Sequence, residues 1–338
     1  MFSHDKPDIN RFLAALALKK HDRVPHFEFV DPENVNTIMG RRLDKRNDQL
    51  GSADTAEFAF LSHQDQILAM NQFWPGEEKG AICGWQDMHR IKWVDSDFKL
   101  LPEKIELLHA HTRARFQAVE GTNLGVGLCV AGPMFSVYES LGPIPIQSFM
   151  LLIHDDLDFV KKIMDIQVDV QVAILEELRS YPFAFIEIAD DLCDNTGFMV
   201  HPSFMEEVWH PRADKTVRAA QSFGIPVTWH CCGKLDGFLP MLAAWGINGI
   251  SPIQASCNDI YGIKRVWGDR LCLFGNMNIE GVLFNGTVDE VIADTKRHID
   301  GLSHNGGYVV QSSHSIVDAI PTENYLAMVQ TTVEYGKF

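Results

Sequence analysis

The sequence predicts an α/β protein built as a single (β/α)8 TIM barrel over residues 1–338, with an N-terminal helical extension and an insertion in its first third. From about residue 120 onward, short apolar runs alternate with longer amphipathic stretches, which is the pattern of consecutive βα units. No Gly-x-Gly-x-x-Gly turn marks an open dinucleotide-binding sheet. Polar residues repeatedly follow the expected strands, and a barrel gathers such residues around one mouth.

The individual elements follow from periodicity and helix punctuation. Asp8 can cap an amphipathic helix over 9–20, which leads into a first strand over 24–29. The region 51–96 is expected to hold a second strand and the insertion, without a definite place for either. The later strands are expected at 124–130, 183–188, 225–229, 249–253, 271–274 and 308–311. The helices are expected at 156–179, 202–223, 235–245, 261–266, 288–303 and 322–335.

Two of these helices begin with the sequence signature of a capping box. Ser203 is followed three residues later by Glu206, and Thr287 by Glu290. In this arrangement each side chain bonds the other residue's backbone N–H, so helices are expected to start at both positions.

Composition and charge limit the function classes. The chain is 46% hydrophobic with a mean hydropathy of -0.06, as in ordinary globular proteins. Its formal net charge of -16 argues against nucleic-acid binding, because such proteins place Lys and Arg against phosphates. No apolar run reaches the roughly 18 residues that span a bilayer, and the N-terminal segment lacks the features of a secretory signal. We therefore expect a cytoplasmic protein without nucleic-acid or membrane partners.

A histidine and a cysteine at the end of the strand expected at 225–229 predict a metal site. His230 and Cys232 are two residues apart, so strand alternation sends both side chains to the same side. An imidazole nitrogen and a thiolate suit zinc better than a hard cation. The alternative is that both are core residues, as we expect of most of the seven scattered cysteines. Polar residues at the ends of other strands favour the metal site, because a histidine buried in the core does not require polar residues at equivalent strand ends.

Further ligands are expected from the ends of other strands. His314 follows the strand expected at 308–311, and Glu187, Asp190 and Asp191 follow an apolar run at 183–186. Adjacent aspartates point in two directions, so at most one of them is expected to reach the mouth directly. The other is expected to cap the next segment or to orient His230.

Substrate-binding candidates are the remaining polar and aromatic residues near strand ends. Glu28, Gln254 and Asn276 can hold polar groups of a substrate, although each can equally satisfy backbone at a strand end. An apolar box for an aromatic ring can be formed by Phe27, Phe29, Trp74, Phe135, Tyr138 and Trp229. Packing in the core is the alternative for these aromatic residues.

Short sequence blocks also recur along the chain in a characteristic order. They are Arg23-Val24-Pro25 with Asp31-Pro32-Glu33, Asp190-Asp191 with Gly197 and Pro202, Gly224 to Val227 before His230 to Gly233, Gly246 to Ile250, Phe274 to Asn278, Gly286-Thr287, Gly306-Gly307 before Ser312 to His314, and Pro321 to Asn324. Their order and spacing resemble the uroporphyrinogen decarboxylase superfamily, a TIM-barrel superfamily, and within it the cobalamin-dependent methyltransferase branch. The resemblance covers most of the chain and is strongest after about residue 180.

Two blocks distinguish the branches of this superfamily. The decarboxylases have Arg-Gln-Ala-Gly-Arg after the first strand, whose arginines hold the carboxylates of the porphyrin, whereas this chain has Phe-Glu-Phe-Val-Asp at 27–31. The methyltransferases resemble this chain in a His-x-Cys after the fifth strand, which binds zinc together with a ligand after the last strand. His230 and Cys232 match the first part, and His314 stands where many of them have Cys. The third ligand thus stays open between His314 and an acidic residue of 187–191.

The resemblance implies a zinc-dependent methyltransferase that works with a corrinoid (cobalamin) carried by a separate corrinoid protein. We expect O-demethylation of a small methylated substrate, an aromatic methyl ether, with Glu187, Asp190 and Asp191 as catalytic candidates. Transfer from methylcobalamin to a thiol or another acceptor is the alternative. A uroporphyrinogen-decarboxylase-like activity is a second alternative, and a non-catalytic scaffold a third. The methyl donor and acceptor, the direction of transfer and the formation of a homodimer stay open.

Overall fold

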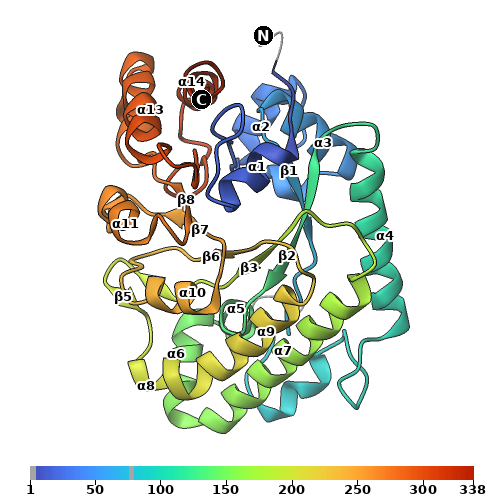
Figure 1. Cartoon of the computed structure of the whole chain (residues 1–338). Helices are drawn as coiled ribbons and strands as arrows, with labels where there is room; N and C mark the ends of the chain where they lie inside the picture. The colour runs from blue at the N-terminus through green and yellow to red at the C-terminus, as the bar shows by residue number, and fades with distance from the viewer. Residues whose placement is uncertain (1–4, 76–79) are drawn as a thin grey trace.

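The computed structural model describes residues 5–75 and 80–338 and shows an α/β fold around a curved parallel sheet (Figure 1). Residues 1–4, in the segment without signal features, and 76–79, in the region expected to hold the insertion, lie outside the described residues. The seven strands, in spatial order, are β1 (Gln66–Met70), β2 (Gly125–Ala131), β3 (Phe185–Ala189), β6 (Val227–His230), β7 (Gly249–Ile253), β8 (Cys272–Gly275) and β9 (Tyr308–Val309). A separate hairpin pairs β4 (Cys193–Asp194) with β5 (Gly197–Phe198).

The strand expected at 24–29 is an extended segment and not a regular strand. Parallel bridges join His26 to Val310 and Val30 to Ile316, so the segment runs along the β9 side of the sheet. On its other side, the backbone N–H of Glu28 donates to the side chain of Gln64, just before β1, at 3.1 Å. No backbone bridge joins the segment to β1 among the described residues. The parallel curled sheet is therefore confirmed, whereas closure into eight regular strands stays a prediction.

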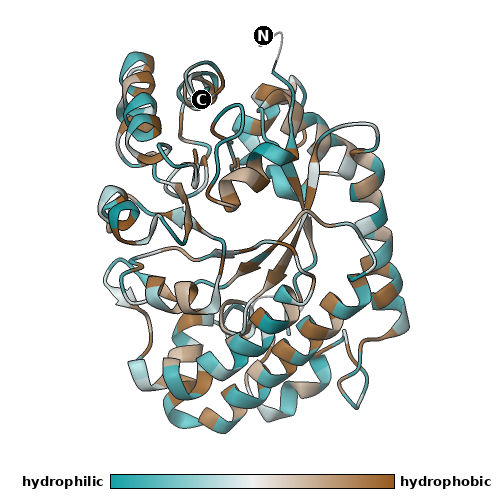
Figure 2. Cartoon of the chain, in the orientation of Figure 1, coloured by the Kyte–Doolittle hydropathy of each residue, from teal (hydrophilic) through white to brown (hydrophobic). Residues whose placement is uncertain are grey.

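Most of the helices lie between successive strands and cover the outer face of the sheet, whereas α1 precedes the first strand and closes one end of the sheet (Figure 1). They are α1 (Ile9–Leu16), α2 (Pro32–Met39), α3 (Ser52–Leu61), α4 (Pro102–Ala118), α5 (Phe135–Ser140), α6 (Pro145–Asp155), α7 (Leu157–Leu178), α8 (Pro202–Phe204), α9 (His210–Gln221), α10 (Leu239–Trp245), α11 (Ile260–Trp267), α12 (Val282–Asn285), α13 (Val288–Leu302) and α14 (Thr322–Tyr335). Along the longer helices, apolar and polar stretches alternate (Figure 2). No helix of the described residues is long and apolar enough to cross a membrane.

The helix expected at 202–223 is divided by a π-helical turn, Met205–Trp209, between α8 and α9. Pro211 lies in the first turn of α9 and has no N–H to donate, which explains why the regular ladder is broken there. The predicted cap at Ser203 is wrong, because the side chain of His201 caps α8 by accepting from the Ser203 N–H. The other predicted capping box, Thr287 with Glu290, is confirmed at the start of α13.

An apolar cluster fills the concave side of the sheet near the amino ends of the strands. α1, capped by Asp8 as predicted, inserts Phe12 here. The Phe12 ring lies 4.8 Å from the Phe185 ring, 5.6 Å from Phe274 and 6.3 Å from Phe27, measured between centroids. The N-terminal helix therefore closes one end of the sheet. What remains open is the end where the strands finish.

Candidate metal centre

A cavity of about 370 Å³ opens at the carboxyl ends of the strands. This is the end at which the sequence predicts that polar residues gather. The predicted residues that line it are Phe29, Trp74, Phe135, Glu187, Asp190, Asp191, His230, Cys232 and His314. Side chains from segments far apart in the sequence thus meet in one place.

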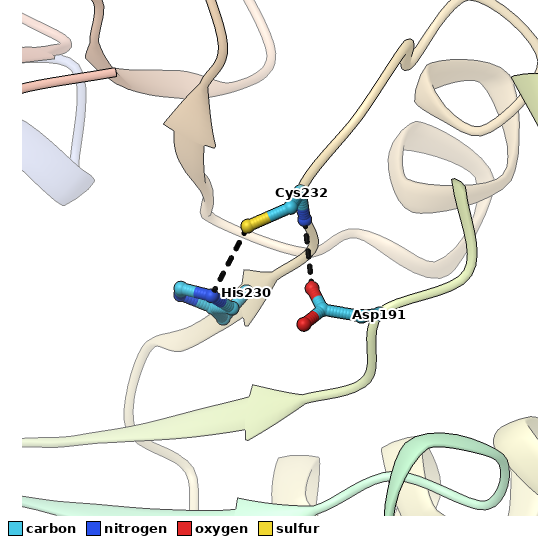
Figure 3. A group of neighbouring side chains, drawn as sticks. All are labelled: Asp191, His230 and Cys232. Carbon is cyan, nitrogen blue, oxygen red and sulfur yellow. Dashed lines mark hydrogen bonds between the residues drawn. The ribbon is translucent and has the colours of Figure 1, made fainter. Parts of the chain in front are cut away.

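Three side chains in this cavity form a group that can hold a metal ion (Figure 3). One ligand atom each from Asp191, His230 and Cys232 lies within 4.8 Å of the other two. The Cys232 Sγ lies 3.8 Å from His230 Nε2, and the Cys232 backbone N–H donates to Asp191 Oδ1 at 2.8 Å. His230 ends β6 and Asp191 follows β3, the neighbouring strand in the sheet.

The turn after β6 is shaped to aim Cys232 into the cavity. Gly233 has a φ of +90°, and a Cβ at that position would lie 2.6 Å from the Cys193 carbonyl oxygen, so a side chain does not fit. The side chain of Gln254 accepts from the Gly233 N–H at 3.0 Å. Cys231 points the other way and is fully buried, as the alternation along the strand requires.

The protonation states of His230 and Cys232 are compatible with binding of a cation. Burial lowers the pKa of His230, so its imidazole is neutral and has a lone pair to offer. Burial and the charge of Asp191 raise the pKa of Cys232 well above its usual range, so the thiol keeps its proton until a cation displaces it. The Nδ1 of His230 is buried without a hydrogen-bond partner among the described residues.

His314 lies on the wall of the same cavity but outside the three-residue group. Its side chain is exposed. The sequence left the third ligand open between His314 and an acidic residue of 187–191. In the structure, Asp191 is the residue that lies next to His230 and Cys232. Within the described residues, the acidic alternative therefore has the closer geometry.

The two adjacent aspartates have different surroundings, as expected from their opposite directions. Asp190 is fully buried and accepts from the N–H groups of Met134 and Phe135, at the start of α5, and from the Trp209 indole at 2.8 Å. Burial nevertheless raises the pKa of Asp190 to about 7. Its hydrogen bonds fix the loop after β2, and Asp191 is the member of the pair that reaches Cys232.

Glu187 forms the floor of the cavity, one step of alternation below Ala189 on β3. Its side chain is 1% exposed, and Oε2 has no hydrogen-bond partner among the described residues. Burial raises the pKa of Glu187 to about 8, although a contact with the Cys129 thiol lowers it. At neutral pH this carboxyl group is therefore mostly protonated and can donate a proton into the cavity.

Four residues that the sequence predicts to bind substrate do not line this cavity. Glu28 turns away and accepts from the Ser312 backbone N–H at 2.7 Å, and Phe27 belongs to the apolar cluster around Phe12. Gln254 holds the turn at Gly233, and Asn276 Oδ1 lies 3.0 Å from His298 Nε2. The reason is common to all four: these side chains already pack in the core or bond a neighbouring backbone or side-chain group.

Of the expected aromatic box, half is present. Phe29, Trp74 and Phe135 line the cavity, and the rings of Trp74 and Phe135 meet edge to face at 5.3 Å. Tyr138 and Trp229 are not part of the wall. Trp229 lies on the outer side of β6, stacked on Trp245 at 5.8 Å, as strand alternation from His230 requires.

Several cavity residues were not predicted from the sequence. The wall is completed by Arg46, Gln49, Met70, Gln72, Cys129, Ala189, Pro252 and Ser315. Met70 is the last residue of β1, so placing the second strand would have revealed it and the nearby Gln72. Arg46 lies in a polar loop without a periodic signal, and only the fold brings it to the cavity.

Comparison with known proteins agrees with the resemblance seen in the sequence. The sequence model of the uroporphyrinogen decarboxylase (URO-D) family matches residues 132–335. The chain is 26% identical over 192 residues to the methylcobamide:CoM methyltransferase MtaA of Methanosarcina barkeri, covering 57% of this chain and 54% of that protein. It is 21% identical over 266 residues to the methylcobamide:CoM methyltransferase MtbA of Methanosarcina acetivorans, covering 77% and 72%. The match thus spans about half the length of the first relative.

A solved structure extends the likeness of fold to nearly the whole chain. The methyltransferase from Methanosarcina mazei superposes with a TM-score of 0.67 at 18% identity, covering 98% of this chain and 99% of that one. This match concerns the fold alone.

Proposed function

The chain belongs to the uroporphyrinogen decarboxylase family, and on that premise we propose that it transfers a methyl group between a small substrate and the cobalt of a corrinoid carried by a partner protein. The observation that carries the proposal is the group of Asp191, His230 and Cys232 at the cavity mouth. The names of its methylcobamide:CoM methyltransferase relatives support the same class of reaction.

Zinc fits the three side chains. With bond lengths typical of zinc, a thiolate sulfur and an imidazole nitrogen on one tetrahedral ion lie about 3.6 Å apart. The 3.8 Å between Cys232 Sγ and His230 Nε2 is close to this separation. Three protein ligands leave the fourth position to a substrate, as in catalytic zinc sites. When bound, zinc supplies a Lewis acid that polarises the substrate heteroatom.

The proposed ligand set favours activation of an oxygen leaving group. It consists of one carboxylate, one imidazole and one thiolate. A single thiolate donates less electron density than two, so the ion keeps more of its Lewis acidity. In O-demethylation the methyl carbon leaves its oxygen, and the electron pair of the broken bond stays on that oxygen. A proton must then reach the oxygen, and Glu187, protonated at neutral pH, is the donor that the cavity floor offers.

The cavity wall supports an aromatic methyl ether as the substrate. Phe29, Trp74 and Phe135 contribute apolar rings to the wall, and the Arg46 guanidinium lies over the Phe29 ring. A methoxylated ring packed against them has its ether oxygen free to face the metal group. The open end of the cavity, at the carboxyl ends of the strands, is where a corrinoid protein is expected to dock.

Transfer from a methylated corrinoid to a thiol is the second candidate, and the names of the relatives favour it. The same three ligands serve both reactions, but the proton moves in opposite directions. A thiol must lose its proton, so Glu187 would act as the acceptor and the rate would rise with pH. In O-demethylation Glu187 donates, and the rate falls above about pH 8, where the carboxyl group ionises.

A decarboxylase acting on a porphyrin fits the cavity less well. Among the described residues that line the cavity, Arg46 is the single Arg or Lys. A substrate with many carboxylates needs several cations at its binding site. The lack of further cations is therefore the physical reason that this activity is the weaker alternative.

The first experiment measures zinc in the purified protein by plasma mass spectrometry, with His230→Ala and Cys232→Ser as variants. We expect about one zinc per chain in the wild type and none in either variant. Cys257→Ser is the matched control, because Cys257 is a half-buried cysteine outside the group. Wild-type protein that takes up no zinc even on reconstitution would contradict the proposal.

The second experiment follows methyl transfer to a reduced corrinoid protein by its absorption spectrum, with methoxylated benzoates as donors. Glu187→Gln is expected to lower the rate by roughly a hundredfold and to remove the fall in rate above about pH 8. A rate that rises with pH, together with transfer to thiols, would favour the second candidate instead.

A further inference from the structure

A second cavity, of about 560 Å³, adjoins the one that holds the metal group. We call it the side cavity. The two share a wall formed by Arg46, Gln49, Met70, Gln72 and Trp74. Beyond this wall the side cavity extends between the loop after α2 and the helix α4, which contributes His111 and Arg115.

Two guanidinium groups line the side cavity, and only one of them binds a carboxylate. Arg46 binds Asp48 through two hydrogen bonds of 2.6 and 2.7 Å, and its guanidinium group also lies over the Phe29 ring, 5.3 Å from the centroid. Its Nη1 has no hydrogen bond among the described residues. Arg115 is 3% exposed and donates to the carbonyl oxygens of Asp48 and Leu50 and to the hydroxyl of Thr55. Arg115 has no ion pair with a carboxylate among the described residues, and its Nε is buried without a partner.

The side cavity therefore carries positive charge in a chain whose formal net charge is -16. Among the residues that line it, Arg46 and Arg115 carry one more charge than Asp48 balances, although Asp31 outside the lining also acts on Arg46. Burial and the charge of Arg115 lower the pKa of His111, so this side chain is neutral. Lys45, at the exposed rim, adds a further positive charge. A partly buried cation without a counterion is costly, and binding an anion relieves that cost.

We propose that the side cavity binds an anionic group of the substrate, a carboxylate or a sulfonate, while the methyl-exchanging atom of the same molecule lies at the Asp191, His230 and Cys232 group. Arg46 is the link, because it lines both cavities. This inference rests on the proposed methyl transfer and adds the chemical class of the substrate. The two oxygens of a carboxylate, or two of the three oxygens of a sulfonate, match the guanidinium geometry, and Arg46 Nη1 is a donor without a hydrogen bond among the described residues.

Binding is tested first, by calorimetry with benzoate and with benzyl alcohol as its uncharged counterpart. We expect benzoate to bind the wild type at least about tenfold more tightly, and Arg46→Gln to abolish this preference. Arg42→Gln, which removes an equal charge from an exposed side chain nearby, is expected to leave it unchanged. Equal binding of benzoate and benzyl alcohol by the wild type would overturn the inference.

Two further variants test whether the carboxylate of benzoate lies in the side cavity or on the metal. Asp48→Asn raises the net charge of the side cavity and is expected to tighten benzoate binding, which a merely disrupted loop would not do. Cys232→Ser, expected to lack zinc, should keep the preference for benzoate. If the preference disappears in Cys232→Ser but survives in Arg46→Gln, the carboxylate binds the metal and the inference is wrong.

Catalysis is tested with matched substrate pairs. 3-Methoxybenzoate is compared with methoxybenzene as methyl donor, and 2-mercaptoethanesulfonate with 2-mercaptoethanol as methyl acceptor. The active pair identifies whether the anion is a carboxylate or a sulfonate. We expect Arg46→Gln to raise KM for the anionic member by about tenfold or more with little change in kcat, and Arg46→Lys to restore part of the loss.

The outcomes distinguish the two proposals. Arg46-dependent binding of benzoate without methyl transfer from any substrate supports the side cavity and contradicts the proposed function. Equal methyl transfer with the charged and uncharged members of a pair supports the function and overturns the side cavity as an anion site.

Discussion

The two ends of the sheet's concave side have opposite character, although the same strands build both. On β3, Phe185 belongs to the apolar cluster around Phe12, and Glu187, two residues further, forms the floor of the open cavity. At the closed end the Phe12 ring of α1 packs against the Phe185 and Phe274 rings of the strands. At the open end Glu187 Oε2 and His230 Nδ1 are buried without partners among the described residues.

This difference indicates that stability and chemistry are separated along the length of each strand. Burial of apolar rings stabilises the fold, whereas a buried polar atom without a partner costs about 1–3 kcal/mol. Such a cost is tolerated where a ligand or a metal supplies the missing partner. Changes at the open end should therefore alter activity more than stability, and changes at the closed end the reverse.

The largest effect is expected from removal of a proposed metal ligand at the open end. Replacement of Cys232 by Ser should lower methyl transfer by roughly a thousandfold, because the stabilisation of the departing group by zinc is worth several kcal/mol. The free energy of unfolding of the metal-free protein should change much less, since Cys232 packs at the edge of a cavity. Urea unfolding and a methyl-transfer assay, carried out side by side, measure both. Retained methyl transfer in a zinc-free variant would contradict the assignment of the chemistry to the open end.

At the closed end, Phe12→Ala should lower the free energy of unfolding by roughly 3–5 kcal/mol. Phe12 is fully buried among three other rings, so its removal leaves a void. The folded fraction should keep its zinc content. Phe60→Ala is the control, because Phe60 is 38% exposed and should cost far less. A large loss of zinc in folded Phe12→Ala protein would show that the two ends are coupled.

The pH dependence of stability tests two buried carboxyl groups, Glu187 in the cavity and Glu28 outside it. Burial raises the pKa of each to about 8, from 4.5. Between these two values the folded state holds a proton that the unfolded chain has lost. The contribution of each group to the free energy of unfolding is therefore fully present below about pH 4.5 and is lost as pH rises through about 8. Each group lowers the free energy of unfolding by up to about 1.4 kcal/mol per pH unit in this window.

Glu187→Gln and Glu28→Gln should each flatten this pH dependence, as followed by urea unfolding at pH 5, 7 and 8.5. Only Glu187→Gln is expected to lower methyl transfer, because Glu28 does not line the cavity. Equal losses of activity in both variants would place Glu28 nearer to the chemistry than its hydrogen bonds to Ser312 indicate.

The smallest effect is expected outside both ends, in the helical layer. Thr287→Ala removes the capping box of α13 and should lower the free energy of unfolding by about 1 kcal/mol. Zinc content and methyl transfer should stay at wild-type levels. A change in either would mean that the helical layer influences the cavity.

Much of the fold could be predicted because its signals are local. Alternation of short apolar runs with amphipathic stretches predicted the strands β2 to β9 of the sheet within a few residues, and Asp8 and Thr287 marked helix starts that the structure contains. The strand β1 was not placed, because Gln66–Met70 follows a polar loop and precedes a long irregular region. A single short strand in such a region has no periodicity of its own.

The site was predictable where it depends on one strand and unpredictable where it depends on several. His230 and Cys232 lie on the same side by alternation alone. Whether Asp190 or Asp191 joins them depends on which one the start of α5 and the Trp209 indole engage. Glu28, Gln254 and Asn276 were expected in the cavity because they follow strands, but each satisfies a neighbour that the sequence does not reveal.

The sequence by itself determined the class of fold, the candidate pair of metal ligands at the end of β6 and the family resemblance, because these depend on residues that are close together along the chain. Only the tertiary structure decided that Asp191 completes the group, that α1 closes one end of the sheet, and that Arg46 and Arg115 share a cavity next to it. The physical reason is that each of these features joins segments far apart in the sequence. Their contact depends on how the whole sheet curves and packs.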